Sequence, residues 1–329
     1  MILVRAPLRI PLGGGGTDLP SYYSQFGGFI LSAAINKYVY ICVNRPAADT
    51  LLRVKYSKYE ETDQVDNIVH DLVRPALKLL QLDSGLEIVS MADVPDGTGM
   101  GSSGSYLVAL LTGLYSFKRE RVAIQALAEQ ACHIEIDLAQ HPVGKHDHYI
   151  AAFGGITCLD IQTDGKVDVS PLDIPIQVAE ELRSLILLFY TGVKRSSSEV
   201  LSEQKRDTEQ GEATVVDSLH MTKKIGLEIK EALEKGDLIR FGQLLDEHWQ
   251  NKKRRSNKIS DPRLDRLYEI AKENGALGGK IMGAGGGGFF MFFCPAGAKA
   301  RLRQAMAAQG LHEMRFNFDY EGAKVLVDF

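Results

Sequence analysis

The stretch DVPDGTGMGSSGSYLVALLTGLYSF, residues 93–117, passes from a glycine-rich loop into a helical pattern within a few positions. Four glycines and three serines lie between Gly97 and Ser105, and leucines at helical spacing follow them. Glycine in a helix costs about 0.5–1 kcal/mol relative to alanine, so such a cluster needs a physical reason. We infer that another group approaches this backbone closely, and that loop and helix form one binding element.

This segment, called the glycine loop below (residues 97–104), has the features of an anion site. The first N–H groups of a helix have no partner within it, and the helix dipole places a partial positive charge there. The loop lacks the lysine of the P-loop pattern and differs from the dinucleotide fingerprint, and a flexible turn before a capped helix is the alternative. We predict that this loop binds a phosphate group, with contacts from Gly97, Gly99, Gly101, Ser102, Ser103 and Gly104.

Two further glycine clusters favour the phosphate interpretation. The first glycine motif, PLGGGGTDL, spans residues 11–19, and the third, KIMGAGGGGFF, spans residues 280–290. Each cluster alone is also compatible with a bulge at the end of a strand. Three clusters in one chain, each beside a strand or a helix, indicate several backbone segments that converge on one polyanion.

The composition excludes several classes of protein. The chain has 329 residues, 45% of them hydrophobic, and a net charge of −4, so we expect no nucleic-acid partner. No apolar run approaches the roughly 18 residues of a membrane span, and the N-terminal segment lacks the apolar core of a signal peptide. The four cysteines are far apart in sequence, which is typical of reduced thiols. We therefore expect a soluble, cytoplasmic protein without a membrane partner.

Strand-like and helical patterns alternate along the chain, which indicates an α+β protein. Residues 161–175 are polar and contain Asp-Gly and two prolines, so we interpret them as a hairpin turn and crossing segment. This segment is also the expected boundary between two domains, residues 1–175 and 176–329. The expected strands are residues 38–45, 51–57, 184–192, 279–293 (interrupted by glycines), 312–318 and 323–329, and the expected helices are residues 68–82, 121–139, 296–309 and a mostly helical block from 196 to 274.

Glu135 lies on the apolar stripe of the helix expected at residues 121–139, whereas His133 and Asp137 fall on its polar side. A carboxylate on a buried face must be paired, protonated or bound to a metal ion. Pairing with a core arginine is one interpretation. The other is ligation of Mg²⁺, which takes one or two protein oxygens and shares the phosphates of the substrate.

Asp147 has Lys145, His146 and His148 as neighbours, a cationic setting that keeps a carboxylate ionised. An ionised aspartate beside a hydroxyl orients or deprotonates the nucleophile in phosphoryl transfer. The competing interpretation is a His-Asp-His metal site. However, His146 and His148 do not share a helical face, and no cysteine joins them. We predict that Asp147 is catalytic.

The chain resembles the GHMP small-molecule kinases, named for galactokinase, homoserine kinase, mevalonate kinase and phosphomevalonate kinase. The stretch APLRIPLGGGGTD at residues 6–18 is similar to their first motif, PDGTGMGSSG at residues 95–104 to their ATP-binding loop, and KIMGAGGGGFF to their third motif. Met100 and Gly104 stand where that loop usually has leucine and alanine, and His148 stands where many related sugar kinases have glutamine. The resemblance implies a two-lobed α+β fold, with an N-terminal half that binds ATP and a ferredoxin-like C-terminal half with an added helical block.

The resemblance also implies roles for individual residues. Asp147 would be the catalytic base, with Arg9 beside it. Ser103 and Glu135 would bind Mg²⁺, while the glycine loop surrounds the ATP phosphates. Substrate contacts would come from Gly14, Gly15, Gly16, Thr17, Asp18, Gly285 and Gly286.

Within this family, the stretches GKHDHYIAAFGG and YTGVKRSSSEVL are most similar to the D-glycero-D-manno-heptose phosphate kinases. The resemblance implies ATP-dependent phosphorylation of the anomeric hydroxyl of heptose 7-phosphate, on the route to nucleotide-activated heptose for surface polysaccharide. A kinase for fucose, galactose or mannose is the nearer alternative. A non-catalytic binder of ATP or sugar is the other.

A sugar that already carries a phosphate needs a second anion pocket. Lys145, Lys194 and Arg195 are candidates, and Arg195 precedes three serines, which suits phosphate. A solvated surface turn is the alternative for Lys194. The run KKRR at residues 252–255 is interpreted mainly as the charged face of a helix, with a contact to the substrate phosphate as the alternative.

Overall fold

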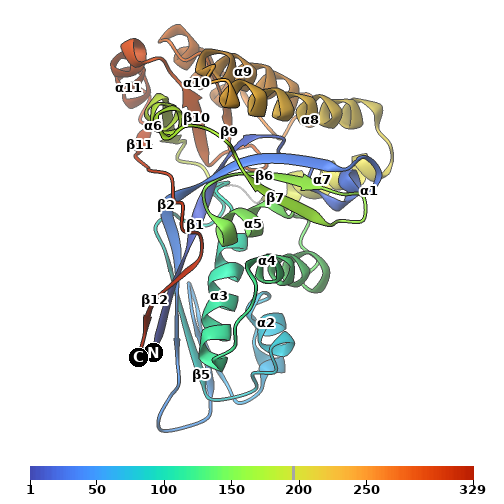
Figure 1. Ribbon diagram of the computed structural model, residues 1–329, viewed down its shortest axis with the longest axis vertical. Coiled ribbons are helices and arrows are strands. Elements are labelled where there is room, and N and C mark those ends of the chain that lie inside the picture. Colours follow the sequence, from blue (N-terminus) through green and yellow to red (C-terminus); the bar gives the residue numbers. More distant parts are fainter. Residues whose placement is uncertain (195–196) are drawn as a thin grey trace.

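The computed structural model describes residues 1–194 and 197–329, which form two sheets with helices packed against them (Figure 1). The longest strands are β1 (Ile2–Gly13) and β2 (Gly28–Asn44), which pair antiparallel along most of their length. Every residue of β1 from Ala6 onward is buried, because α3 (Ser102–Lys118) and α8 (Ala213–Glu234) both pack against β1 and β2. This burial explains why the strand reads as an almost continuous apolar run.

The first sheet has eight strands and joins the two ends of the chain. The last strand, β12 (Lys324–Asp328), pairs antiparallel with β1, so residues beyond 175 complete this sheet. The division of the chain at residue 175 stays a prediction. Figure 1 shows the two termini side by side. A hairpin of β6 (Ile156–Ile161) and β7 (Val167–Pro171) extends from β2, as predicted for the polar turn. The main path runs through β12 (Lys324–Asp328), β1, β2, β5 (Leu86–Ala92), β3 (Leu52–Lys55) and β4 (Tyr59–Thr62).

The second sheet has four antiparallel strands, in the order β11 (His312–Met314), β8 (Ile186–Tyr190), β10 (Phe289–Phe293) and β9 (Gly278–Ile281). Numbered along the C-terminal half, this order is fourth, first, third, second, with helices between the first and second strands and between the third and fourth. That is the ferredoxin-like arrangement, so the expected fold is confirmed. All five residues of β10 are buried, which places this strand at the centre of the C-terminal core.

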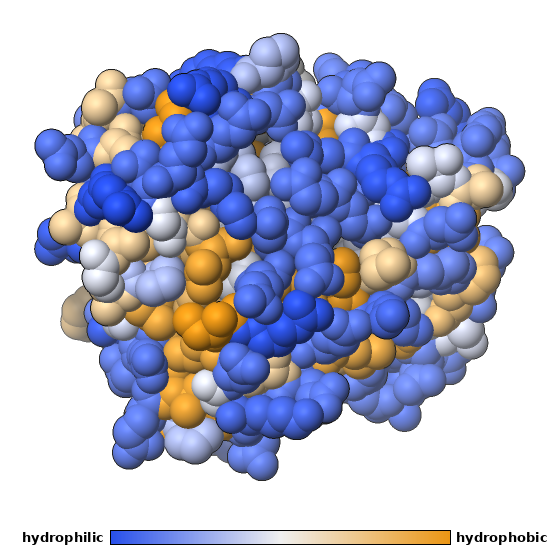
Figure 2. Space-filling view, turned by 90° about the horizontal axis from the view of Figure 1, so that it is seen from above, coloured by the Kyte–Doolittle hydropathy of each residue, from blue (hydrophilic) through white to orange (hydrophobic). Residues whose placement is uncertain are grey.

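A layer of helices is inserted between β8 and β9, as predicted for the helical block. Asp237 and Asp261 each accept a hydrogen bond from a backbone N–H of the following turn, which fixes where two of these helices begin. Figure 2 looks onto this end of the molecule and shows hydrophilic residues over most of the face. In the described part of the chain, no helix is long and apolar enough to cross a bilayer. The inserted helices are α7 (Ser197–Glu209), α8, α9 (Leu238–Lys253) and α10 (Pro262–Glu273).

Two expected helices differ from the observed ones. The helix expected at residues 121–139 is α4 (Ile124–Cys132), and it continues as a π-helix at His133–Leu138. Such wide turns are frequent at functional sites, and this one contains Glu135. The helix expected at residues 68–82 is shorter, because a 3₁₀ turn and a loop precede it. The remaining helices are α1 (Pro20–Phe26), α2 (Val73–Leu79), α5 (His146–Phe153), α6 (Ile176–Leu185) and α11 (Lys299–Ala308).

Candidate active site

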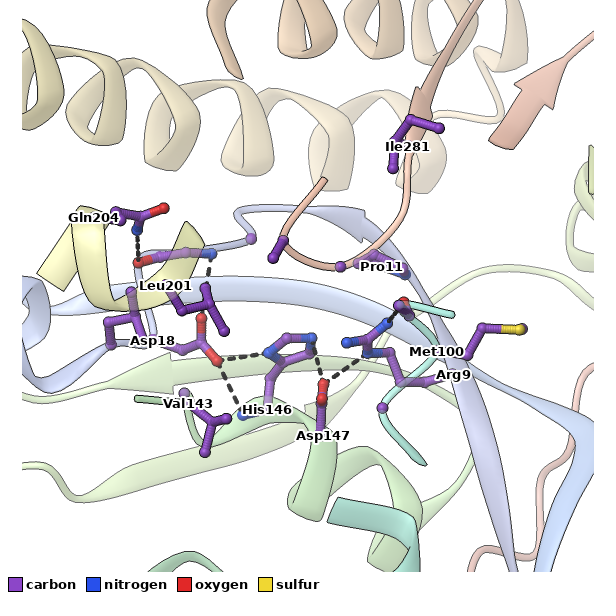
Figure 3. A pocket seen from close by; sticks show the side chains of 18 of the residues that line it. Arg9, Pro11, Asp18, Met100, Val143, His146, Asp147, Leu201, Gln204 and Ile281 are labelled. Carbon is purple, nitrogen blue, oxygen red and sulfur yellow. Dashed lines mark hydrogen bonds and ion pairs between the residues drawn. The ribbon is translucent and has the colours of Figure 1, made fainter. Parts of the chain in front are cut away.

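One cavity gathers most of the residues that the sequence predicts for the site (Figure 3). Its walls come from the first glycine motif, the glycine loop, the start of α5, and the segments α9 and β9 of the C-terminal half. The predicted residues that line it are Arg9, Gly15, Gly16, Asp18, Gly97, Gly99, Gly101, Ser102, Ser103 and Asp147.

The glycine loop has a backbone that other residues rarely adopt. Gly97, Gly99 and Gly101 have φ angles of 75°, 78° and 78°, and Gly101 is the N-cap of α3. Positive φ at alternate residues turns neighbouring N–H groups toward one side, and the helix dipole adds positive potential. Ser102 Oγ is buried and has no hydrogen-bond partner within the described residues. The loop therefore has the backbone geometry predicted for an anion site, together with an unused hydroxyl.

The third glycine motif packs directly against this loop. A Cβ at Gly283 would lie 2.6 Å from the Cα of Gly99, so the two backbones are in direct contact. Gly285 and Gly286 pack against Ile259, whose carbonyl accepts a hydrogen bond from Gly286 N at 2.8 Å. The geometry thus gives these two glycines a bracing position and not a place in the cavity lining.

Asp147 is held by two cations at the start of α5. Its Oδ1 lies 2.7 Å from Arg9 Nε and 2.8 Å from His146 Nε2, which leaves Oδ2 available to a ligand. Arg9 Nη1 also donates to the carbonyl of Gly99 at 2.6 Å, which ties the aspartate to the glycine loop. A Cβ at Gly104 would lie 2.7 Å from Asp147 Cβ, so the glycine at this position lets α5 approach α3 closely.

His146 links this aspartate to a second one. Its Nδ1 lies 2.6 Å from Asp18 Oδ2, and its backbone N–H donates to the same oxygen at 3.1 Å. Asp18 Oδ1 accepts a hydrogen bond from Gly16 N at 3.2 Å. Asp18, His146, Asp147 and Arg9 therefore form a charge chain of alternating sign across the cavity floor (Figure 3). His146 was not among the predicted site residues, and its only signal in the sequence was its position beside Asp147.

The charges in this chain stabilise one another. Burial disfavours an ionised carboxylate, but Arg9 and His146 outweigh burial and hold the pKa of Asp147 far below its ordinary value. His146 lowers the pKa of Asp18 in the same way. Burial likewise disfavours a charged imidazole, yet Asp147 and Asp18 raise the pKa of His146 to about 9. At neutral pH the chain therefore consists of two carboxylates, an imidazolium and a guanidinium.

We expect kcat at saturating substrate to fall as the pH rises through about 9, where His146 loses its proton. Because this pKa is raised above the ordinary 6.5, the charge contribution of the ring to stability is complete below pH 6.5 and is lost as the pH passes about 9. A pH profile of kcat for the wild type and His146→Asn checks this, and the variant should lack the alkaline limb. His133→Asn, an exposed histidine paired with Asp137, is the control. An unchanged limb in His146→Asn would contradict the assignment.

Glu135 is paired with histidines. Pairing with a core arginine, which was one interpretation of the sequence, is not observed among the described residues. Glu135 Oε2 lies 2.7 Å from His148 Nε2 and its Oε1 lies 3.3 Å from His141 Nδ1, and the hydroxyl of Ser103 is a further neighbour that lowers its pKa. Burial raises the pKa of a carboxyl group, but these donors outweigh it and lower the pKa of Glu135 to about 2. Burial also disfavours charge on His148, yet Cys132 and Glu135 raise its pKa well above the usual range. Glu135 is therefore ionised.

The oxygen atoms of Glu135 and Ser103 fit the requirements of Mg²⁺. This ion prefers hard oxygen ligands and usually takes one or two from the protein. An ionised carboxylate and the hydroxyl of Ser103 meet within hydrogen-bond reach, at the N-terminal end of α3. His146 and His148 do not form a metal site together, because His146 contacts Asp18 and His148 contacts Glu135.

Other predicted residues lie outside the cavity lining. Thr17 Oγ1 donates to the carbonyls of Gly14 and Phe29 at 2.9 Å, so Gly14 and Thr17 shape the first glycine motif from beneath. Lys145 Nζ donates to the carbonyl of Gly165 at 2.6 Å and pairs with a carboxylate, which turns it away from the cavity. Arg195 lies outside the described residues.

Sequence reasoning did not predict a basic group in the site, although it kept a contact of residues 252–255 with the substrate phosphate as an alternative. His248, Lys252, Arg255 and Lys280 line the cavity from the C-terminal half and are all buried. The interpretation of residues 252–255 as a charged surface face is therefore wrong for Lys252 and Arg255. Only the two residues between them keep contact with solvent.

Comparisons with known proteins show what the whole chain is similar to. Residues 67–155 match the GHMP kinases N terminal domain, and residues 229–312 match GHMP kinases C terminal. The chain is 28% identical to the D-glycero-alpha-D-manno-heptose 7-phosphate kinase of Campylobacter jejuni over 98% of both chains. It is also 28% identical to the galactokinase of Pyrococcus furiosus over 87% of both chains.

The fold has a solved counterpart in the same family. A crystal structure of a D-glycero-D-manno-heptose 1-phosphate kinase from Bacteroides thetaiotaomicron superposes with a TM-score of 0.83, at 25% identity and full coverage of both chains. The two family matches together cover more than half of the chain, and they include both the glycine loop and α9. The chain therefore belongs to the GHMP kinases, a family of ATP-dependent phosphotransferases.

Proposed function

We propose that this protein transfers the γ-phosphoryl group of ATP to the anomeric hydroxyl of D-glycero-D-manno-heptose 7-phosphate, forming the 1,7-bisphosphate. The observation that carries the proposal is the charge chain from Asp18 to Arg9, set beside the glycine loop in one cavity. The name of the relative from Campylobacter jejuni, which aligns over nearly the whole chain, supports a heptose phosphate as the acceptor.

Asp147 would align the acceptor hydroxyl with the γ-phosphorus. Its Oδ1 is taken by Arg9 and His146, so Oδ2 would accept the hydrogen bond of the hydroxyl. A carboxylate with so low a pKa is a weak base. In the loose transition state of phosphoryl transfer, however, the hydroxyl proton leaves late, when the bond to phosphorus is already forming. Asp147 therefore orients first and accepts the proton last.

The sugar would lie over the first glycine motif. Asp18 is ionised and lines this cavity, so it can accept hydrogen bonds from sugar hydroxyls. Gly15 and Gly16 line the same wall and present backbone groups without side chains in the way. A pocket that hydrogen-bonds hydroxyls discriminates strongly against analogues that lack them.

ATP would extend from the glycine loop into an adjoining cavity. That cavity shares Ser102 and Ser103 with the first one and is walled by Tyr56, His70 and Tyr106. The rings of His70 and Tyr106 are stacked with centroids 5.1 Å apart. We assign the purine base to this aromatic wall, because flat rings offer a stacking surface and a partly apolar setting.

Magnesium would be held by Ser103 and Glu135, next to the phosphates on the glycine loop. When bound there, Mg²⁺ neutralises charge on the β- and γ-phosphates. The residues of the chain supply the rest: loop amides and Ser102 bind the phosphates, while Arg9 and His146 keep Asp147 in place.

The test is an assay of ADP release with Mg²⁺ and ATP, using heptose 7-phosphate, unphosphorylated heptose, galactose, fucose and mannose as acceptors. We expect kcat/KM to be about tenfold or more higher for heptose 7-phosphate than for any other acceptor, a difference of about 1.4 kcal/mol or more. Phosphorus NMR of the product should show a second phosphate on the anomeric carbon.

Two outcomes would contradict the proposal. Faster turnover of galactose or fucose would assign the protein to another branch of the family, as the galactokinase relative allows. No ADP release with any acceptor, despite measurable ATP binding, would make it a non-catalytic binder.

A further inference from the structure

Four basic side chains form a buried cluster on the part of the cavity wall that the C-terminal half provides, here called the basic cluster. His248 and Lys252 come from α9, Arg255 follows that helix, and Lys280 lies on β9. Their exposed fractions are 2%, 7%, 6% and 2%, yet all four line the open cavity. Lysine and arginine are rarely buried unless a partner neutralises them.

The two lysines of the basic cluster have only neutral partners. Lys252 Nζ donates to the carbonyls of Ile281 and Gly283 at 3.1 and 2.6 Å. Lys280 Nζ donates to the carbonyl of Leu12 at 3.1 Å. Within residues 1–194 and 197–329, neither ammonium is paired with a carboxylate, so both charges lack compensation.

The other two members repeat this pattern. Arg255 Nε donates to Ser218 Oγ at 3.0 Å, and its Nη1 donates to the carbonyl of Gly15 at 3.3 Å. Both ring nitrogens of His248 are buried without a hydrogen-bond partner in the described part of the chain. Buried polar groups are normally hydrogen-bonded, so an imidazole that lines a cavity without a partner is expected to bind a ligand.

Such a cluster is unfavourable in the empty protein. Burial and then Arg255 and Arg9 lower the pKa of Lys280 to about 7, and burial together with Lys280 lowers the pKa of Lys252 well below its usual range. Removing charges from water without a counter-charge is costly, and the like charges also repel one another. A dianion in the cavity would relieve both penalties.

We propose that the basic cluster is the binding site for the phosphate that the acceptor sugar already carries. This inference rests on the proposed function and locates the second anion pocket that a sugar phosphate requires. Arginine and lysine together provide the charge and the directed N–H groups that bind a phosphate dianion. Two candidates suggested by the sequence fit less well, because Lys145 is paired with Glu129 and Lys194 is exposed to solvent, and the third, Arg195, lies outside the described residues.

The position of the basic cluster favours the acceptor phosphate over the triphosphate of ATP. Arg255 and Lys280 donate hydrogen bonds to the carbonyls of Gly15 and Leu12, respectively. Both carbonyls belong to the first glycine motif, which also contains Asp18. The amides of the glycine loop lie at the start of α3, and of the cluster only Lys252 approaches them, through the carbonyl of Gly283, which contacts Gly99. One cavity thus has two anion-binding walls, as a reaction between two phosphate-bearing substrates needs.

The test compares Lys252→Met and Lys280→Met with Lys253→Met. Lys253 is the neighbouring residue on α9, but it pairs with Asp265 and does not line the cavity, so it is a matched control. We expect each cluster variant to raise the KM for heptose 7-phosphate about 20-fold while the KM for ATP changes less than about twofold, consistent with loss of one charged contact. The control should behave as wild type. An equal rise in the KM for ATP, or no change in either constant, would overturn the inference.

A binding measurement separates this inference from the proposed function. Inorganic phosphate, with ADP present to fill the nucleotide site, should raise the melting temperature of the wild type and Lys253→Met, but not that of the double variant Lys252→Met, Lys280→Met. The double variant should itself melt no lower than wild type, because it loses uncompensated buried charge. If this pattern holds while no sugar phosphate is turned over, the proposed function fails and the phosphate site stands. If sugar phosphate is turned over but phosphate protects the double variant equally, the phosphate site fails.

Discussion

Asp147→Asn should lower kcat by about a thousandfold, the scale typical for loss of a group that aligns and deprotonates a nucleophile. Asparagine keeps the size of the side chain, but its amide cannot take the proton of the acceptor hydroxyl. It also removes the negative charge between Arg9 and His146, so that Asp18 alone is left to compensate the imidazolium. Binding of ATP should persist, because the glycine loop does not depend on this carboxylate.

The measurement is kcat by ADP release, with calorimetric titration of ATP to show that the nucleotide still binds. Asp168→Asn is the control, since Asp168 is an exposed aspartate on β7. A thermal melt belongs to the experiment, because loss of a buried charge partner costs about 3–5 kcal/mol unless His146 gives up its proton. A kcat within about tenfold of wild type in a folded variant would remove Asp147 from the catalytic role.

Glu135→Gln should lower the rate at limiting Mg²⁺ by about a hundredfold, equivalent to roughly 2.7 kcal/mol, and higher Mg²⁺ should restore part of it. The neutral amide is a poor ligand for a hard cation. The variant should also lose stability by about 1–3 kcal/mol, because His148 is fully buried and loses its counter-charge. The contribution of Glu135 to stability is complete above about pH 4.5 and is lost as the pH falls through about 2.

Two readouts distinguish a metal ligand from a purely structural acid. Rates measured across a range of Mg²⁺ concentrations report ligation, and urea unfolding reports stability. Asp137→Asn is the matched control, because Asp137 lies two residues further along the same π-helix and is exposed. Lower stability with an unchanged Mg²⁺ dependence would make Glu135 structural only.

Much of the cavity could be predicted from local sequence. The glycine loop can be recognised in the sequence because positive φ angles and close backbone contact both require glycine at individual positions. The ferredoxin-like half follows from the alternation of strands and helices together with the family resemblance. From the sequence we inferred only that the glycine clusters converge on one ligand. The structure adds that the third glycine motif and the glycine loop are in direct contact, at Gly283 and Gly99.

The basic residues show where sequence reasoning stops. In the run KKRR, Lys252 and Arg255 turn into the cavity, while the two residues between them do not. Which side of a charged helix end is buried depends on how α9 packs against β9, and this packing has no local signature. Lys145 shows the opposite error: the sequence suggested that it contacts the substrate phosphate, yet it is paired with Glu129 on α4.

The local sequence was enough to predict the kind of site: a glycine loop at a helix start, an aspartate in a cationic setting, and an acid on the buried face of a helix. These features depend on backbone conformation and charge over a few neighbouring residues. Only the tertiary structure decided which charges meet, since Arg9 and Asp147 are 138 residues apart and Asp18 and His146 are 128 apart. Electrostatic partners are set by distance in space, and in this fold two sheets and an inserted helical layer bring distant segments to one cavity.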